Sequence, residues 1–376
     1  MRNYDIVVIG SGIIGLATAY AAVKQGLSVA VLERHARCVG ASIRNFGFIT
    51  VSGQRAGEHW RRAKYSRDRW AEIAPQAGIP IAQRGLYMPA QRPEATAVAE
   101  AFLHTEMGKD CRWLSKTEIA EKLPFLGPHE GVLFSPHELR VESKTAIPQL
   151  ANWLTKVHHV DFYWQTQAHR IELPTITTSQ GEIRGEHCIV CAHHDATHLY
   201  PELYKQAAIK LCTLQMLRVK PQKSIPLPGA LMSDLSFARY DGFAQLPEGK
   251  FLGLLLDQTM ENYRQFGIHL IVVQSQDGSW IIGDSHRYTD AEIPFRDEHI
   301  DALIIAELQR LIPNQTFSVR ERWLGVYPSA DDVVLKYSPT NGVAVGVVTS
   351  GTGASTGFAL GEELLTLALN SNRKTI

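Results

Sequence analysis

Residues 5–15 read DIVVIGSGIIG, and this stretch decides the fold. The run Asp5–Ile9 is apolar and β-branched, which predicts a buried strand, and Ile13–Val23 changes to small apolar residues that suit a helix. A second apolar run, Ser28–Leu32, predicts another strand and ends on the acid Glu33. Strand, glycine turn, helix and strand therefore follow one another within 33 residues, which is the order of a βαβ unit.

The glycine turn has the pattern GxGxxG in the context that dinucleotide binding requires. Gly10 permits the tight turn, Gly12 lets the backbone approach a pyrophosphate, and Gly15 lets the helix pack closely on the strand. Glu33 stands 18 residues beyond Gly15 (33 − 15), where it can accept hydrogen bonds from ribose hydroxyls and would repel a 2′-phosphate. The residues expected to bind a dinucleotide other than NADP are Gly10, Gly12, Ile13, Ile14, Gly15 and Glu33.

The composition is that of an ordinary globular enzyme. The 376 residues exceed what one core usually serves, so we expect two packed domains. Lys and Arg balance Asp and Glu at 38 each, which gives no field to recruit nucleic acid or an anionic membrane. The N-terminal region has no basic run, cleavage site or membrane-length apolar span, so we expect a cytoplasmic protein. The oligomeric state is left open.

Cysteine and histidine clusters raise two other possibilities. Cys188 and Cys191 have CxxC spacing but lie in an apolar run typical of a strand, which favours buried structural thiols over a redox pair. His193, His194 and His198 lack an accompanying set of carboxylates and cysteines with a recognisable ligand pattern. We therefore expect packing or substrate contact for the histidines and no metal site.

Further elements follow from periodicity along the chain. Helices are expected at Gly57–Ala74 and Thr145–Val157, and the end of the chain reads as a strand at Val343–Val348, a glycine turn at Ser350–Gly353 and a helix at Phe358–Leu369. Between residues 211 and 282 the chain has alternating or apolar runs that predict an antiparallel sheet; they are LQMLRVK, FLGLLL, IHLIVVQ and SWIIG.

Two further segments carry a resemblance to a known family. Glu33-Arg34 is followed by GASIRNFG at residues 40–47, and SGTGASTG stands at residues 350–357. Together with the first glycine turn they resemble the D-amino-acid oxidase family of flavoenzymes, which includes glycine oxidase and sarcosine oxidase. The segment IVCAHHDAT departs from the family's AAGxW pattern, because His193 replaces the glycine and the tryptophan is absent.

The resemblance implies that the cofactor is FAD. The loop after Glu33 would wrap the pyrophosphate and ribityl chain, through Arg34, Ala41, Ser42, Gly47 and Phe48. The second glycine loop, with Gly351, Gly353 and Thr356, would start a helix whose N-terminus stabilises the anionic reduced flavin. In the sarcosine oxidase branch a cysteine links the flavin covalently, but Gly325 stands at that position here, which predicts noncovalent FAD.

The expected fold is α/β. A Rossmann-type FAD-binding domain with a parallel sheet would comprise residues 1–83, 145–215 and 320–376. An interleaved α+β substrate domain with an antiparallel sheet would comprise residues 84–144 and 216–319.

The expected substrate is a small anionic amine. Family members that oxidise amino acids hold the carboxylate with the arginine of GxRP, whereas this chain has GVYP with Tyr327, which disfavours an ordinary D-amino acid. The segments GASIRNFG, SPHELRVES and GDSHRY with this tyrosine resemble a branch linked to aminophosphonate breakdown. The resemblance implies 2-aminoethylphosphonate or its N-methyl relatives, held by donors from several directions. The candidate substrate-site residues are Arg44, Arg140, His286, Tyr288 and Tyr327.

The implied reaction moves a hydride from the carbon next to nitrogen to the flavin, and water hydrolyses the resulting imine to an aldehyde or ketone. Alternatives within the class are a glycine, sarcosine or D-amino-acid oxidase. From other classes, we kept an NAD-dependent dehydrogenase and a nonenzymatic module in which FAD only stabilises the fold.

Overall fold

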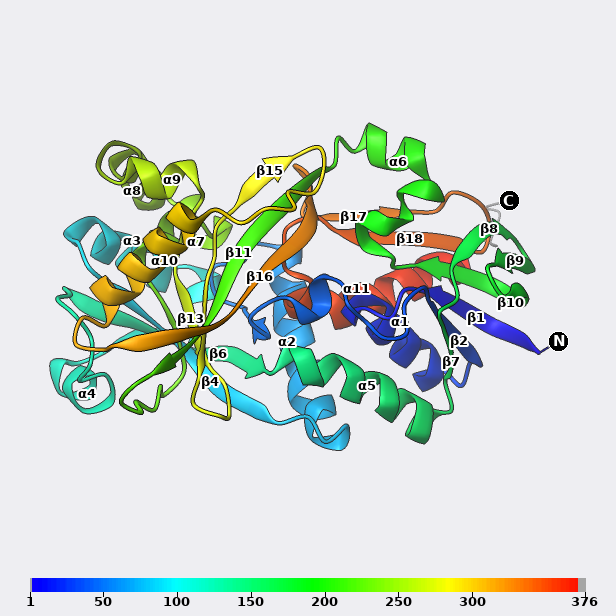
Figure 1. Ribbon diagram of the computed structural model, residues 1–376, viewed down its shortest axis with the longest axis horizontal. Helices are drawn as coiled ribbons and strands as arrows, with labels where there is room; N and C mark the ends of the chain where they lie inside the picture. Colours follow the sequence, from blue (N-terminus) through cyan, green and yellow to red (C-terminus); the bar gives the residue numbers. More distant parts are fainter. Residues whose placement is uncertain (1, 371–376) are drawn as a thin grey trace.

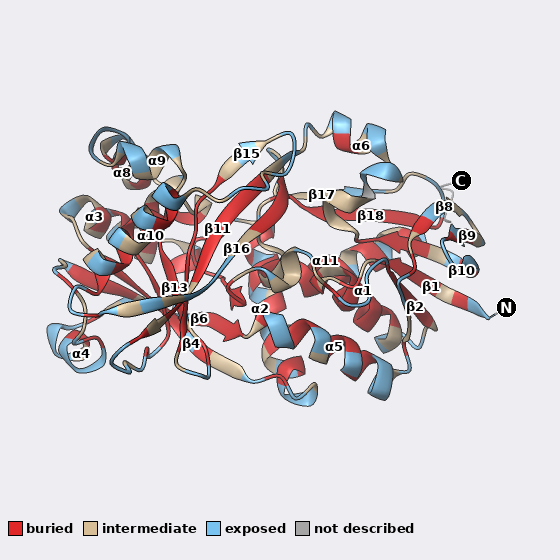
Figure 2. Cartoon of the chain, viewed as in Figure 1, coloured by how far each residue is buried: buried red, intermediate tan, exposed pale blue. Residues whose placement is uncertain are grey.

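The computed structural model describes residues 2–370, which form two lobes side by side along the long axis of the molecule (Figure 1). One lobe is built on an 8-stranded sheet and the other on a 10-stranded sheet, called here the first and second sheets. Buried residues concentrate on the strands and on the inner faces of the helices (Figure 2). Among the helices of residues 2–370, none combines the length and apolar character that crossing a membrane needs.

The first sheet contains the strands that the opening motif predicts. Its order is β17-β18-β10-β1-β2-β7, and β1 lies in the middle, parallel to β10 and to β2. The edge strand β17 is antiparallel to β18. The strands are β1 (Asn3–Ile9), β2 (Val29–Glu33), β7 (Asp161–Trp164), β8 (Ala168–Glu172), β9 (Thr175–Thr178), β10 (Gly181–Val190), β17 (Val334–Tyr337) and β18 (Val343–Val348). Because helices cover its faces, the ends of the central strands next to the glycine turns are buried and apolar, at Ile6–Ile9, Val29–Leu32 and Cys188–Val190.

Helices α1 and α11 pack against each other over the first sheet (Figure 1). A Cβ atom on Gly361 of α11 would lie 2.7 Å from the carbonyl carbon of Ala17 and 2.7 Å from the backbone nitrogen of Thr18, so the two backbones approach as closely as glycine allows. The helices of this lobe are α1 (Ile13–Lys24), η1 (Ala41–Ile43), α2 (Glu58–Gln76), α5 (Ser143–His158), η3 (His193–His198), α6 (Pro201–Gln206) and α11 (Gly353–Asn370).

The second sheet is mostly antiparallel, in the order β15-β11-β14-β13-β12-β4-β6-β3. Strand β16 pairs with β11 along its whole length, and β5 pairs with β6. The strands are β3 (Phe48–Ile49), β4 (Ile81–Ala90), β5 (Arg112–Trp113), β6 (Gly131–Val141), β11 (Lys210–Pro221), β12 (Ala230–Met232), β13 (Ile271–Gln274), β14 (Trp280–Gly283), β15 (Arg287–Thr289) and β16 (Phe317–Ser329). Its helices are α3 (Pro93–Leu103), η2 (Glu106–Gly108), α4 (Lys116–Lys122), η4 (Asp234–Ala238), α7 (Asp241–Ala244), α8 (Pro247–Thr259), α9 (Glu261–Gln265) and α10 (Glu298–Leu311).

The structure confirms the α/β fold with two sheets, but it corrects one predicted strand. The run FLGLLL lies within helix α8, not in the antiparallel sheet. Its exposure has helical spacing, because Leu252 and Leu256 are buried whereas Phe251 and Leu254 are exposed. An apolar run of this length is ambiguous between the two structures when taken alone.

The expected boundaries also differ from the observed elements. Helix α11 begins at Gly353 rather than Phe358, since small residues in its first turn let it lie close to α1. Strands β11 and β16 belong wholly to the second sheet, so the domain boundaries expected at 215 and 320 cut through paired strands. The register of the β11–β16 ribbon depends on residues about 100 positions apart, so local composition does not predict it.

The α1–α11 contact predicts a difference between two glycine substitutions in helices. Gly361→Ala should lower the free energy of unfolding by about 1–3 kcal/mol, because backbone atoms of α1 would have to move. Gly253→Ala in α8 should raise it by about 0.5–1 kcal/mol, since a Cβ there meets only the far end of Arg264 at 3.9 Å. Urea unfolding of both variants measures the difference, and equal effects would contradict the packing argument.

Candidate active site

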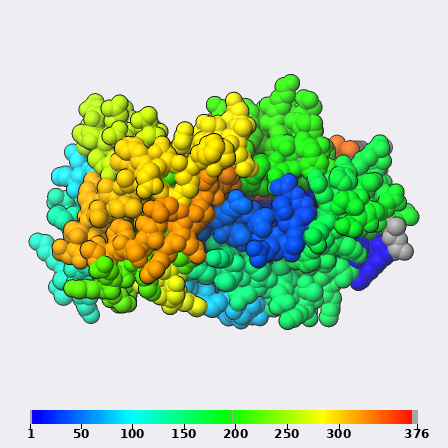
Figure 3. Space-filling view, in the orientation of Figure 1, coloured from blue at the N-terminus to red at the C-terminus, as the bar shows by residue number. Residues whose placement is uncertain are grey.

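A cavity of about 330 Å³ lies where the two lobes meet, at the carboxyl ends of β1 and β18. This volume is at the lower end of the range for small-molecule sites. The first lobe contributes the starts of α1 and α11 and the segment around η1, and the second contributes β16 and the loops around β13, β14 and β15. In the space-filling view the blue segment that includes η1 reaches the surface beside the orange strand β16 (Figure 3).

The start of α1, at Ile13 and Ile14, lines one end of the cavity, and the turn between β1 and α1 lies directly before it. Gly10 has φ +104°, and a Cβ there would lie 2.8 Å from the carbonyl oxygen of Cys191. A Cβ on Gly15 would lie 1.9 Å from the carbonyl oxygen of Gly10, so only glycine fits both positions.

Gly12 supplies no side-chain cap for α1, and the first turn of the helix has no acid. The N–H of Ile13 donates to the Ser42 hydroxyl at 3.0 Å. The first N–H groups of α1 and its dipole therefore suit a phosphate.

Glu33 is held in the place that the sequence predicts for a ribose ligand. Its Oε2 accepts hydrogen bonds from the backbone N–H of Ser11 at 3.1 Å and from the Ser11 hydroxyl at 2.7 Å. Its Oε1 accepts from the backbone N–H of His35 at 3.0 Å. These contacts fix the carboxylate at the end of β2, beside the glycine turn. Arg34 points elsewhere and pairs with Asp195 at 2.8 Å.

The other predicted cofactor residues divide into two groups. Those that line the cavity are Ile13, Ile14, Ala41, Ser42, Phe48, Gly351 and Gly353. Those outside its lining are Gly10, Gly12, Gly15, Glu33, Arg34, Gly47 and Thr356. Gly47 has a packing role, since a Cβ there would lie 1.7 Å from the carbonyl oxygen of Val141. Thr356 is buried within α11 and donates its hydroxyl hydrogen bond to the carbonyl of Thr352 at 3.0 Å.

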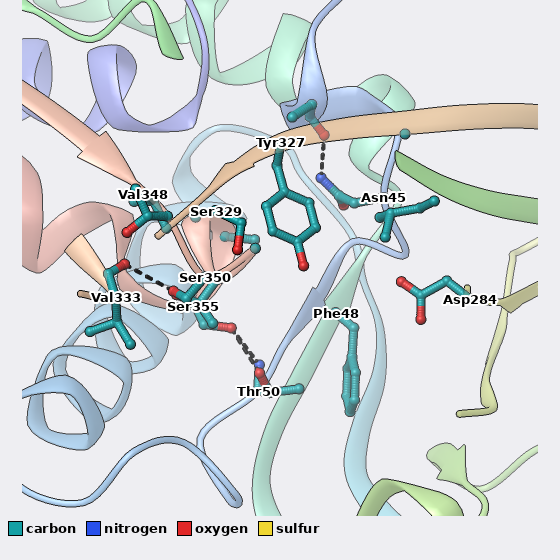
Figure 4. A pocket seen from close by; sticks show the side chains of 18 of the residues that line it. Asn45, Phe48, Thr50, Asp284, Tyr327, Ser329, Val333, Val348, Ser350 and Ser355 are labelled. Carbon is teal, nitrogen blue, oxygen red and sulfur yellow. Dashed lines mark hydrogen bonds between the residues drawn. The ribbon is translucent and has the colours of Figure 1, made fainter. Parts of the chain in front are cut away.

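The loop before α11 joins the two ends of the cavity. Gly351 has φ +71°, and a Cβ there would lie 3.1 Å from the ring of Tyr327. The Ser350 hydroxyl donates to the carbonyl of Val333, and the Ser355 hydroxyl lies 3.0 Å from that of Thr50 (Figure 4). The glycine therefore makes room for the aromatic ring against the start of α11.

Polar side chains of the second lobe gather at the opposite end. Tyr327 lies on β16, and a terminal N–H of the Arg239 guanidinium donates to the Tyr288 hydroxyl at 2.8 Å. Burial disfavours the charge of Arg239, but the nearby phenols of Tyr327 and Tyr288 and the carboxylate of Asp284 raise its pKa, so it stays charged. Burial raises the pKa of Tyr327 well above its usual value, so the phenol remains a neutral donor. One cation and two hydroxyls therefore form a set of donors for an anion.

The sequence prediction for Arg140 is wrong in its location. Arg140 is fully buried in β6 outside the cavity lining, where a terminal N–H donates to Glu142 at 2.9 Å and Nε to the carbonyl of Phe46 at 3.2 Å. Glu142 also pairs with Arg218 at 3.3 Å. Arg44 lines the cavity and is exposed at the end of η1. The register of β6 directs the Arg140 side chain into the interior, where it pairs with Glu142. Sequence spacing alone did not predict this direction.

Among the lining residues that the sequence prediction did not include, Arg239, His269 and Asp284 are the three on which the chemistry below depends. Arg239 follows Leu235 and Phe237, two buried apolar residues, and a lone arginine beside such a run was the available signal. Asp284 directly follows β14 in the segment GDSHRY, from which only His286 and Tyr288 were selected.

His269, Asp284 and His286 form a buried group in which one potential ligand atom from each lies within 4.8 Å of the others. This spacing would suit a small divalent cation, but the charge of Arg239 acts on all three residues and opposes a second cation. Burial raises the pKa of Asp284 to about 7 and lowers that of His269 to about 3. Near pH 7 the Asp284 carboxyl is therefore about half protonated, whereas His269 is neutral.

The histidines and cysteines between residues 188 and 198, which the sequence analysis singled out, belong to the first lobe. His193 lines the cavity, and its Nδ1 lies 2.8 Å from Nδ1 of His194. His194 pairs with Glu292 at 3.0 Å, and Nε2 of His198 lies 3.0 Å from the carbonyl of Ala168. Cys188 and Cys191 are buried free thiols, and burial raises the pKa of Cys191 to about 12.

Comparison with known proteins gives a consistent assignment. The model of a family described as FAD dependent oxidoreductase (DAO) matches residues 5–367. Glycine oxidase from Bacillus cereus ATCC 14579 superposes with a TM-score of 0.78 at 16% identity, over 99% of both chains. L-proline dehydrogenase from P. horikoshii gives 0.77 at 17% identity, over 99% of this chain and 95% of that one. L-α-glycerophosphate oxidase from Mycoplasma pneumoniae gives 0.73 at 17%, over 100% and 96%. No curated protein sequence matches the chain.

The two arginines of the sequence prediction should differ in their effect on stability. Arg140→Met should lower the free energy of unfolding by about 3–5 kcal/mol, because it leaves buried polar partners without their cation. Arg44→Met, at an exposed position, should change it by less than about 0.5 kcal/mol. Urea unfolding measures both variants, and a stable Arg140→Met protein would show that the ion pair has no structural role.

Proposed function

The chain belongs to the family of FAD-dependent oxidoreductases, and from this premise we propose that it oxidises the C–N bond of a small amine that carries an anionic group. The observation that supports the proposal is the guanidinium of Arg239 beside the hydroxyls of Tyr288 and Tyr327, at the end of the cavity opposite the glycine turn. A cation and neutral donors at that place suit an anionic substrate rather than an apolar amine.

The residues at the other end fit FAD. The N-terminus of α1, which has no acid in its first turn, would bind the pyrophosphate together with the Ser42 hydroxyl that accepts from Ile13, and Glu33 would accept from the ribose hydroxyls of the adenosine. The N-terminus of α11, also without an acid in its first turn, would lie near the flavin ring. When bound, FAD supplies the acceptor for the hydride that leaves the carbon next to nitrogen. Gly325 carries no nucleophile, so noncovalent binding stays our prediction.

Within the cavity the chain's own residues bind and orient the substrate. Arg239 would pair with the anion, and Tyr288 and Tyr327 would donate hydrogen bonds to its other oxygens. Tyr327 and Phe48 are buried side chains of the cavity lining, so they would shield a bound flavin and substrate from water (Figure 4). Arg44, at the exposed mouth, would attract the anion on entry.

A phosphonate amine is the substrate class that we favour, with 2-aminoethylphosphonate and its N-methyl derivative as first candidates. The donors reach the anion site from η4, β15 and β16, and this spread of directions suits a tetrahedral anion better than one planar fork does. Glycine, sarcosine and D-amino acids are the alternative. The structurally similar proteins include both a glycine oxidase and a glycerophosphate oxidase, so the fold is compatible with either anion. Membership of an FAD family leaves no support for an NAD-dependent dehydrogenase.

Reduction of the bound flavin by substrate tests the proposal. The purified holoenzyme is mixed anaerobically with 2-aminoethylphosphonate, its N-methyl derivative, glycine or sarcosine, and the oxidised flavin absorbance is followed. We expect the phosphonates to bleach the band at concentrations that leave it unchanged with the amino acids. Bleaching by glycine or sarcosine alone would reject the phosphonate, and no bleaching by any amine would reject amine oxidation.

Replacement of Arg239 tests the anion site. Arg239→Met should raise the Kd of the bleaching amine by about 10- to 100-fold, because a charge-assisted contact to the anion is lost. The matched control is Arg264→Met, which removes a half-buried arginine of α9 paired with Asp257 of α8, outside the cavity lining, and should leave Kd unchanged. Kd comes from the dependence of the flavin reduction rate on amine concentration, and FAD content reports folding. Unchanged Kd in Arg239→Met would place the anion elsewhere.

A further inference from the structure

Asp284 and His286 form a buried pair at the cavity wall, and one carboxylate oxygen of Asp284 makes no hydrogen bond to residues 2–370. Both residues line the cavity, and Asp284 is 5% exposed and His286 8% exposed. The Asp284 carboxylate and the Tyr327 hydroxyl project into the same space from opposite sides (Figure 4). Among the described residues, Oδ1 of Asp284 has no hydrogen-bond partner. Nε2 of His269 lies 3.3 Å from this oxygen without making a hydrogen bond to it, so the carboxylate keeps an open position for a donor from the cavity.

The hydrogen bond of His286 to the backbone fixes its tautomer. Nδ1 of His286 lies 2.8 Å from the carbonyl oxygen of Gly267, which can only accept, so Nδ1 carries the proton. In the neutral ring, Nε2 therefore presents a lone pair, and this atom lies 3.8 Å from Oδ2 of Asp284. Two acceptors thus face each other across the cavity wall. The arrangement becomes favourable when a proton or an N–H donor enters between them.

The surroundings determine which donor fits. The charge of Arg239 acts on both members of the pair, His269 acts on His286, and Asp284 in turn acts on Cys212 and Tyr240. Tyr288 and Tyr327 act on Arg239, and the centroid of the Tyr327 ring lies 6.4 Å from that of His286. Arg239 is the one permanent cation among these groups, and it would repel a metal ion held by the pair. An ammonium group that arrives with its own anion, which pairs with Arg239, avoids this repulsion. A zwitterionic amine therefore fits the pair better than a free cation does.

We propose that Asp284, supported by His286, is the proton acceptor that converts the bound substrate's ammonium group into a neutral amine. The inference rests on the proposed amine oxidation and identifies the group that prepares the substrate for it. One N–H bond of the ammonium breaks and its electron pair stays on nitrogen, while the proton forms an O–H bond with the carboxylate. The nitrogen lone pair is then available to form the C=N bond as the neighbouring hydride leaves.

The electrostatics of the pair suit this role at neutral pH. Burial raises the pKa of Asp284 to about 7, although Arg239 opposes the rise. Burial and the charges of Arg239 and His269 lower the pKa of His286 well below its usual value, so its Nε2 keeps the lone pair. Above pH 7 Asp284 is ionised and can accept a proton, whereas below pH 7 it is already protonated. The rate of flavin reduction should therefore rise with pH through about 7.

The test measures how flavin reduction depends on pH in matched variants. The limiting anaerobic rate is recorded from pH 5.5 to 10 at saturating 2-aminoethylphosphonate, or with whichever of the four amines bleaches the wild-type holoenzyme. Asp284→Asn should reduce the rate at pH 7 by about 100-fold. The deficit should shrink towards pH 10, where water alone removes the amine's proton. Asp290→Asn removes an exposed carboxylate six residues away and should follow the wild-type profile.

A second variant keeps the test independent of folding. His286→Asn retains an N–H near the position of Nδ1, for the carbonyl of Gly267, and has no group where Nε2 stands. It should reduce the rate at pH 7 by about 10-fold and shift the profile to higher pH. If Asp284→Asn loses FAD, this variant decides the question. FAD content and urea unfolding confirm that each variant compared is folded.

The outcomes separate this inference from the proposed function. Identical pH profiles for wild type, Asp284→Asn and His286→Asn would overturn the proton acceptor while leaving amine oxidation intact. Failure of all four amines to reduce the wild-type flavin would overturn amine oxidation first. Stoichiometric metal in the wild type that is lost in Asp284→Asn would also overturn the inference, because the carboxylate would then be a ligand.

Discussion

The close contact between the β1–α1 turn and its neighbours is the constraint on which the rest of the structure depends. Gly15 brings α1 against the backbone of Gly10, and Gly361 brings α11 against α1. Because no side chain separates these backbones, both helices start at the same edge of the first sheet, with their N-termini towards the cavity. Two helix dipoles thereby converge on one place, which suits a cofactor that carries phosphates at one end and gains negative charge at the other.

The β11–β16 ribbon connects the second lobe to the start of α11 in the first lobe. Its pairing runs from Lys210 opposite Ser329 to Pro221 opposite Phe317, and it extends from the second sheet towards the start of α11. Tyr327 on this ribbon contacts the loop before α11 at Gly351, so the substrate end is positioned directly against the cofactor end. Strand register therefore sets where the substrate end of the cavity lies relative to the cofactor end.

Buried charges play two different roles in the molecule. Arg140 is paired with Glu142 inside the second lobe, and its neighbours satisfy most of its donors, which is typical of a structural ion pair. At the cavity, Arg239 and Asp284 are close enough to influence each other's pKa, yet Oδ1 of Asp284 keeps no partner among the described residues. A buried charged group that faces a cavity and lacks a hydrogen bond is typical of a functional site, whereas a buried ion pair away from a cavity is typical of a structural one.

The sequence by itself determined the elements whose physics is local. The strand Asp5–Ile9, the glycine turn, helix α1 and the last strand could be predicted because the apolar β-branched runs and the spacing of the glycines are contiguous in the chain. Of these glycines, Gly15 is required by the carbonyl of Gly10 five residues before it, whereas Gly10 also lies against Cys191, a contact that only the tertiary structure shows. Only the tertiary structure decided which charged side chains meet at the cavity. Arg140 and Arg239 look alike in sequence, but the register of β6 buries one in an ion pair, whereas the end of η4 places the other at the cavity wall. The substrate site gathers side chains from η4, β13, β14, β15 and β16, and pairing between distant strands, which no short segment encodes, sets their positions.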